Sequence, residues 1–83
     1  MSKKHGYHLR EIEKGEYGKI SKVVEEIEEY KDAIDQGTEI MALVELADVY
    51  GALEEVVKSH GMSMEDLKIF SNITKRAFEN GFR

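Results

Sequence analysis

The sequence contains no cysteine and no proline. Without cysteine, disulfide bonds cannot hold the chain together, and the redox compartment stays undetermined. Without proline, internal repeats or low-complexity tracts, nothing marks a linker, so the 83 residues are expected to form one domain, 1–83. A domain of this size buries a limited fraction of its surface, and many such domains depend on a metal ion or on oligomerisation for stability.

A long hydrophobic run is also missing. No apolar stretch reaches the length of a membrane span, and the polar start of the chain lacks a signal-peptide core. The net charge of −5 argues against duplex nucleic acid as a partner, because that binding depends on neutralising phosphates. We therefore expect a soluble, cytoplasmic protein that binds neither membranes nor nucleic acid.

Basic residues are nearly absent from the middle of the chain. Eleven of the 17 acidic residues lie in 25–55, a stretch with a single basic residue, Lys31. The other basic residues lie in the two flanks. This distribution suits a metal site with cationic groups nearby for an anionic ligand, although charge on solvated helix faces is the simpler interpretation of composition alone.

Apolar residues recur at helical spacing in three segments, which predicts an all-α fold. Helices are expected at about 19–36, 38–60 and 63–80, after an irregular N-terminal segment at 1–15. In the first helix the apolar stripe consists of Ile20, Val23, Val24, Ile27, Tyr30 and Ile34. In the third helix the residues expected to face the core are Leu67, Phe70, Ile73, Thr74, Ala77 and Phe78.

The second helix carries apolar residues on two flanks, and one chain offers too few helices to cover both. An uncovered flank would leave a large apolar patch, which soluble monomers rarely tolerate. We therefore expect a helical bundle that is completed by oligomerisation, as a homodimer or a dimer of dimers.

A first acidic cluster lies within the first predicted helix. Glu25, Glu26 and Glu29 fall within about 100° of one another on a helical wheel, whereas Glu28 projects elsewhere. The three lie roughly opposite the apolar stripe, on the face that is normally solvated. They become functional if a second helix packs beside them or if they line a cleft.

A second acidic cluster interrupts the most apolar helix. Glu45 and Asp48 are the only charged residues in 40–53, and their spacing of three places them on one helical face. A carboxylate in such surroundings is costly unless it is paired or bound to a metal. If the two helices face each other, four or five carboxylates share one space, and their repulsion demands protons or cations. Oxygen ligands of this kind suit Mg²⁺, with Mn²⁺ as a possible substitute.

The two clusters together resemble a known signature. Glu25-Glu26-x-x-Glu29, then fifteen residues, then Glu45-x-x-Asp48, on successive helices, is similar to the motif of the MazG-like all-α nucleoside triphosphate pyrophosphohydrolases. That superfamily includes the dimeric dUTPases and the phosphoribosyl-ATP pyrophosphohydrolases. The resemblance covers about residues 14–83. It implies Mg²⁺-dependent cleavage of a nucleoside triphosphate between its α- and β-phosphates, giving the monophosphate and pyrophosphate.

The resemblance also implies roles for individual residues. Glu26, Glu29, Glu45 and Asp48 match the Mg²⁺ ligands of that superfamily. Glu25 matches an outer ligand or a residue that orients the water, so Glu25 and Glu26 are the candidates for catalysis.

Other residues of the match would bind the substrate. Lys68, Asn72, Lys75 and Arg76 look like the C-terminal basic segment that reaches the triphosphate in that superfamily. Lys22, one turn before Glu26, is a further candidate for the same role. The only aromatic residues before the first motif are Tyr7 and Tyr17, so the resemblance does not identify the base.

Two alternatives stay open at this point. The chain could be a non-catalytic helical dimer that binds a protein partner and carries its acids as solvated charge. It could also keep the fold and the metal but act on phosphoribosyl-ATP. Glu45 and Asp48 are the residues that discriminate, because a simple scaffold has no reason to place two acids in its most apolar helix.

Overall fold

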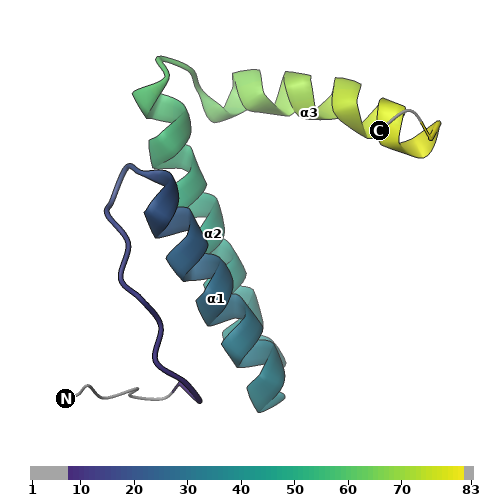
Figure 1. Ribbon diagram of the computed structural model, residues 1–83. Helices are drawn as coiled ribbons and strands as arrows, with labels where there is room; N and C mark the ends of the chain where they lie inside the picture. Colours follow the sequence, from purple (N-terminus) through teal and green to yellow (C-terminus); the bar gives the residue numbers. More distant parts are fainter. Residues whose placement is uncertain (1–7, 82–83) are drawn as a thin grey trace.

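Three helices and no strand make up the described part of the chain, residues 8–81, in the computed structural model (Figure 1). Their bounds are Ile20–Gln36 for α1, Glu39–Ser59 for α2 and Met64–Glu79 for α3. The predicted all-α class is confirmed, and every predicted boundary lies within one residue of the observed one. None of these helices is long and apolar enough to cross a membrane. Predictions that concern residues 1–7, such as Tyr7, lie outside the described residues.

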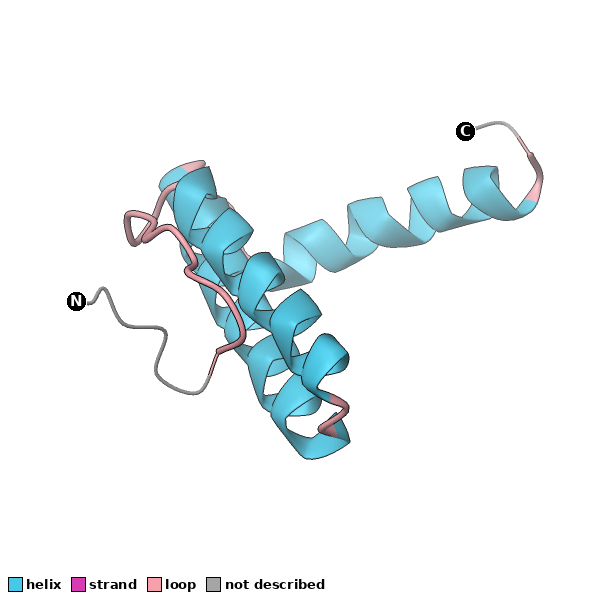
Figure 2. Ribbon diagram, turned by 60° about the horizontal axis from the view of Figure 1, so that its bottom comes forward, coloured by secondary structure: helices cyan, strands magenta, loops and turns pink. Residues whose placement is uncertain are grey.

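A two-residue turn sets α1 and α2 side by side and antiparallel (Figures 1 and 2). Gly37 ends α1 with a φ of 77°, a left-handed conformation that glycine adopts without a steric penalty. Thr38 occupies the N-cap position of α2, but its side chain makes no capping hydrogen bond. At the start of α3, Ser63 and Asp66 form a reciprocal capping box.

The buried apolar residues between α1 and α2 are small. The buried apolar residues of the described chain are Val23, Ala33, Ala42, Ala52 and Val57. Small side chains allow the two helices to approach closely, and the remaining buried positions are occupied by carboxylates rather than by the larger apolar residues.

The buried face of α1 is not the predicted one. Most of the apolar stripe faces outward, with Ile20 64 % and Ile34 51 % exposed, while Glu25 and Glu26 are buried. The acidic face is therefore not solvated, as such a face normally is; a second helix packs beside it, which is the alternative that the sequence left open. The physical reason is that α2 and the N-terminal segment both pack on the acidic side of α1, which leaves the apolar stripe without cover in the single chain.

Helix α3 extends away from the α1–α2 pair (Figures 1 and 2). It contacts α2 only near the connecting turn and does not contact α1. None of its residues is buried; Phe70 is 53 % exposed and Ile73 60 %. The prediction that these side chains face a core is wrong for the single chain, because the direction of α3 takes its apolar side away from α1 and α2.

Residues 8–15 form an irregular strap that runs beside α1 (Figure 1). Two carboxylates of α1 hold it by its backbone. Asp32 accepts hydrogen bonds from the Leu9 N–H, at 3.0 and 2.9 Å to its two oxygens, and from the Arg10 N–H at 3.2 Å. Glu25 accepts one from the Gly15 N–H at 2.9 Å. A Cβ at Gly15 would clash with the backbone of Ser21, so close approach requires glycine there.

Asp32 is fully buried as a charged group. Burial alone would raise the pKa of its carboxyl, but hydrogen bonds from the Gln36 side chain and from the Leu9 and Arg10 N–H groups lower it below the ordinary value. A lowered pKa in the folded state means that the ionised form stabilises the fold above the unfolded-state pKa. That contribution is lost as the pH falls through the folded-state value.

We expect Asp32→Asn to loosen the strap and to lower the free energy of unfolding by about 2 kcal/mol, because hydrogen bonds to a charged group contribute roughly 1.5–3 kcal/mol each. Urea denaturation measures the loss, and amide hydrogen exchange at Leu9 and Arg10 should accelerate. The matched control is Asp35→Asn on the same helix. Asp35 is exposed and pairs only with the Arg10 side chain among residues 8–81, so this change should cost less than about 0.5 kcal/mol. Equal effects of the two changes would contradict the role given to Asp32.

Candidate metal centre

The antiparallel pair of helices brings the two acidic clusters together. Ligand oxygens of Glu26, Glu45 and Asp48 all lie within 4.8 Å of one another, and those of Glu25, Glu26 and Glu29 do so as well. Glu26 belongs to both groups and links them. All four residues predicted to bind metal therefore lie in one continuous carboxylate cluster between α1 and α2.

Most of this cluster is shielded from water. Glu45 is 1 % exposed, Glu25 4 % and Glu26 6 %, whereas Asp48 is exposed at the open edge of the cluster. Burial makes each charge costly unless a partner offsets it. The groups around each carboxylate therefore show how the protein offsets the cost of burying these negative charges.

The surroundings of Glu26 leave one of its two carboxylate oxygens unsatisfied. Its Oε2 lies 3.0 Å from the Lys22 ammonium, but its buried Oε1 has no hydrogen-bond partner among residues 8–81. A buried carboxylate oxygen without a donor is a destabilising feature that a bound cation would remove. The donor set is carboxylate oxygen throughout, which is the chemistry that Mg²⁺ and Mn²⁺ prefer.

Glu29 shows how the cluster accommodates its charge without a metal ion. Burial, the negative charge of Glu26 and hydrogen bonding with Glu45 together raise the pKa of the Glu29 carboxyl to about 8. At neutral pH a proton on Glu29 therefore takes the place of a cation. Binding of a divalent ion would displace that proton.

Lys22 and Glu25 form the edge of the cluster nearest the strap. The Lys22 ammonium lies 3.0 Å from Glu25 Oε1, and hydrogen bonds to Glu26 and Glu25 raise the pKa of Lys22. Burial alone would raise the pKa of Glu25, but the Gly15 N–H and Lys22 lower it. Glu25 Oε1 thus has two donors already. Glu25 fixes the strap, and the catalytic role expected for it stays a prediction.

Two residues beside the cluster were not predicted from the sequence. His8, on the strap, has its Nε2 3.9 Å from Glu29 Oε1 and its Nδ1 3.6 Å from Asp32 Oδ1. Asp32 shares the acidic face of α1, because its spacing of three from Glu29 and seven from Glu25 repeats the helical period. That spacing could have indicated Asp32, whereas nothing in the sequence predicts that the strap places His8 there.

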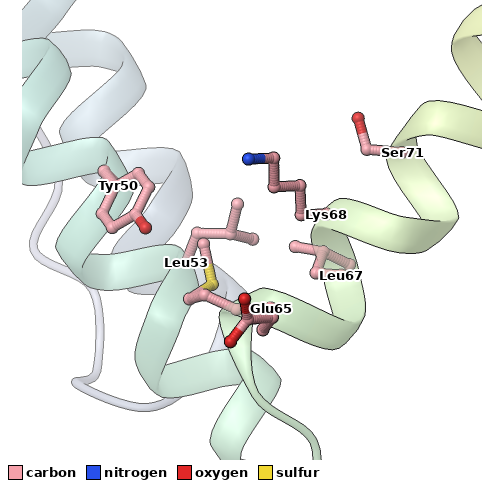
Figure 3. Close-up of a pocket in the computed structure, with 7 residues that line it drawn as sticks. Tyr50, Leu53, Glu65, Leu67, Lys68 and Ser71 are labelled. Carbon is pink, nitrogen blue, oxygen red and sulfur yellow. The ribbon is translucent and has the colours of Figure 1, made fainter.

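The predicted basic segment on α3 is not brought to the carboxylates within one chain. Its members, Lys68, Asn72, Lys75 and Arg76, lie on a helix that does not contact α1. Lys68 lines a hollow of about 480 Å³ at the turn between α2 and α3, near Tyr50, Leu53 and Leu67 (Figure 3). This hollow lies apart from the carboxylates. The substrate-binding role of the four residues stays a prediction, and only Lys22 adjoins the cluster.

A smaller cavity, of about 290 Å³, opens directly onto the carboxylates. Glu26, Asp48 and Lys22 line the part next to the cluster, and it continues along α2 toward Glu54 and Glu55. We call it the cluster cavity. It offers a ligand direct access to the proposed cation.

Comparisons of the chain with protein-family models, with curated proteins and with solved structures found no match. The chemistry of the site therefore rests on its own geometry. That geometry provides oxygen ligands for a divalent cation, one ammonium group and an adjoining cavity.

We expect the metal-free protein to lose stability as the pH rises from about 4.5 to about 8, since the folded-state pKa of Glu29 lies above its unfolded value. Protonated Glu29 stabilises the fold at low pH, and the contribution is lost as the pH rises through about 8. Thermal unfolding in EDTA measures this dependence. Glu29→Gln should remove most of this pH dependence. Glu28 lies on the same helix and forms a surface ion pair with Lys31, so Glu28→Gln should leave the pH dependence in place. An unchanged dependence in Glu29→Gln would show that another group titrates.

Proposed function

We propose that the protein is a Mg²⁺-dependent nucleoside triphosphate pyrophosphohydrolase, which cleaves a ribo- or deoxyribonucleoside triphosphate to the monophosphate and pyrophosphate. The observation that carries the proposal is the carboxylate cluster between α1 and α2. It consists of two groups of three residues that share Glu26, and within each group the ligand oxygens lie within 4.8 Å of one another. The buried Oε1 of Glu26 has no partner in the described part of the chain. The resemblance of the two acidic motifs supplies the reaction.

Glu26, Glu45 and Asp48 would hold the cation, with Glu29 as a further ligand once its proton is displaced. A bound Mg²⁺ supplies charge neutralisation at phosphate oxygens and activation of the attacking water. Asp48, as the exposed member of the set, faces the side from which the triphosphate enters. Buried Glu45 holds the inner side of the cluster.

Lys22 is the cationic group for the phosphates. Its ammonium lines the cluster cavity and lies 3.0 Å from Glu26 Oε2. An ammonium group placed there stabilises charge that develops on the leaving pyrophosphate. Because two carboxylates raise its pKa, Lys22 stays charged throughout the working pH range.

A second copy of the chain is part of the proposal. Large apolar residues remain exposed on all three helices, including Ile20 on α1, Leu43 and Tyr50 on α2, and Phe70 and Ile73 on α3. Exposed apolar residues in this number favour association. We propose a homodimer or a dimer of dimers in which these faces pack against each other.

The non-catalytic alternative explains only part of the molecule. A helical interaction module would account for the exposed apolar faces, but it gives no reason to bury Glu26 and Glu45 beside each other. A substrate such as phosphoribosyl-ATP would use the same cluster. Measuring hydrolysis of phosphoribosyl-ATP beside that of the nucleoside triphosphates distinguishes the two kinds of substrate.

We expect Glu45→Gln and Asp48→Asn each to reduce Mg²⁺-dependent pyrophosphate release by at least about 100-fold, because each removes a metal ligand. Stability in EDTA should be unchanged or higher, since repulsion within the cluster falls. The assay measures pyrophosphate from a panel of triphosphates with purified protein. Glu28→Gln is the control and should be nearly silent. Full activity in both cluster variants would contradict the proposed site.

We expect light scattering at micromolar concentration to give at least twice the chain mass of 9.5 kDa. Phe70→Asp or Ile73→Asp on α3 should weaken the association, because a charge cannot be buried at an apolar contact without a partner. Ser71→Asp adds the same charge elsewhere on α3 and serves as the control. A fully active species at the mass of one chain would contradict the oligomer.

A further inference from the structure

The cluster cavity extends well beyond the carboxylates. Asp48 lines its near end, and Glu54 and Glu55 line its far end. Six to seven residues of helix separate these positions, which is about 10 Å along the axis of α2. That length is on the scale of a nucleoside. The wall between the two ends is built from small residues, Ala47, Gly51 and Ala52, which leave room for a flat group.

The two ends of the cavity differ in what they can bind. At the near end, Glu26 is only 6 % exposed, and its Oε1 has no hydrogen-bond partner within residues 8–81. A cation and the triphosphate belong there under the proposed function, on which this inference rests. At the far end, Glu54 and Glu55 would repel phosphate. The nucleoside must therefore extend toward Glu54 and Glu55.

The two far-end carboxylates are not equivalent. Glu55 is ion-paired with Lys58, at 3.3 Å. Glu54 has no ion pair or hydrogen bond of its side chain in the described part of the chain. An ionised carboxylate accepts hydrogen bonds through both oxygens and donates none. Glu54 therefore suits a ligand edge with two adjacent N–H donors.

We propose that the far end of the cluster cavity recognises the base and that it selects guanine. Guanine presents two adjacent donors, N1–H and the N2 amino group, which match the two oxygens of Glu54 in a charge-assisted pair. Adenine and cytosine offer an amino group beside a ring nitrogen acceptor. Their amino group can donate to one oxygen of Glu54, but the ring nitrogen has no proton to donate to the other oxygen. Uracil and thymine present one N–H between two carbonyl oxygens, which the carboxylate repels.

Tyr17 completes this end of the cavity. It lines the same space as Glu54 and is 69 % exposed, so its ring is accessible to a ligand. Aromatic side chains stack on bases irrespective of base identity. Tyr17 therefore contributes affinity for any base, whereas Glu54 contributes the selection.

The first test compares GTP, ITP, ATP and UTP with Mg²⁺ and the full-length protein. We expect kcat/KM for GTP to exceed that for UTP by at least about tenfold, with ITP, which lacks the N2 amino group, in between. Glu54→Gln should reduce kcat/KM for GTP about tenfold and leave that for UTP within about twofold. Glu39→Gln, an exposed acid of α2 outside the cavity, is the matched control and should preserve the ratio.

The second test fills the cavity without disturbing the helix. A Cβ at Gly51 would meet no atom within 4 Å, so the methyl group of Gly51→Ala enters the cavity, while alanine suits a helix better than glycine. We expect KM to rise at least about threefold for every triphosphate, with Mg²⁺ affinity unchanged and thermal stability equal or higher.

The outcomes separate this inference from the proposed function. Turnover of all four triphosphates at equal kcat/KM, or a GTP-to-UTP ratio that Glu54→Gln leaves unchanged, would overturn the base site alone. Absence of turnover with every triphosphate would overturn the proposed function and the base site together. An unchanged KM in Gly51→Ala would show that substrate does not occupy this cavity.

Discussion

Repulsion among five carboxylates in the space between α1 and α2 is the constraint on which the rest of the structure depends. The repulsion is relieved in a different way at different members of the cluster. Lys22 neutralises one edge of the cluster, the Gly15 N–H donates to Glu25, and Glu29 retains a proton because its pKa is raised to about 8. Glu26 Oε1 is left with no donor among residues 8–81. A divalent cation would satisfy that oxygen and replace the proton in one step, which links the fold to the proposed chemistry.

The acidic face of α1 performs two tasks that its sequence does not distinguish. Glu25 and Asp32 accept hydrogen bonds from backbone N–H groups of the strap and so fix residues 8–15 along the helix. Glu26 and Glu29 turn toward α2 and its carboxylates. The strap therefore closes one side of the cluster, while Asp48 leaves the other side open to the cluster cavity. Access to the proposed cation is consequently directed along α2.

Much of this arrangement could be predicted from the sequence, and the reasons are local. Helix bounds follow from apolar periodicity and from signals such as Gly37 and the Ser63–Asp66 capping box. The meeting of Glu26 with Glu45 and Asp48 follows from their spacing on two helices joined by a short turn. These features depend on a few neighbouring residues, and local rules describe them well.

The remaining features depend on partners that periodicity does not identify. A stripe such as that of α1 shows that one side is apolar, but it does not show whether α2, α3 or another chain covers it. For this reason the exposure of the apolar stripe of α1 and the outward course of α3 were not predicted. The strap escaped prediction because backbone N–H groups, common to all residues, hold it to Asp32. The role of Asp32 is consequently invisible in a sequence that contains many acids.

Diffraction from crystals grown with Mn²⁺ tests the central claim most directly, because anomalous scattering locates manganese without reference to activity. We predict an anomalous difference peak between α1 and α2, with carboxylate oxygens of Glu26, Glu45 and Asp48 as its nearest protein atoms. An ordered cluster without manganese, in which water and protonated carboxyls alone surround Glu26 Oε1, would contradict the account.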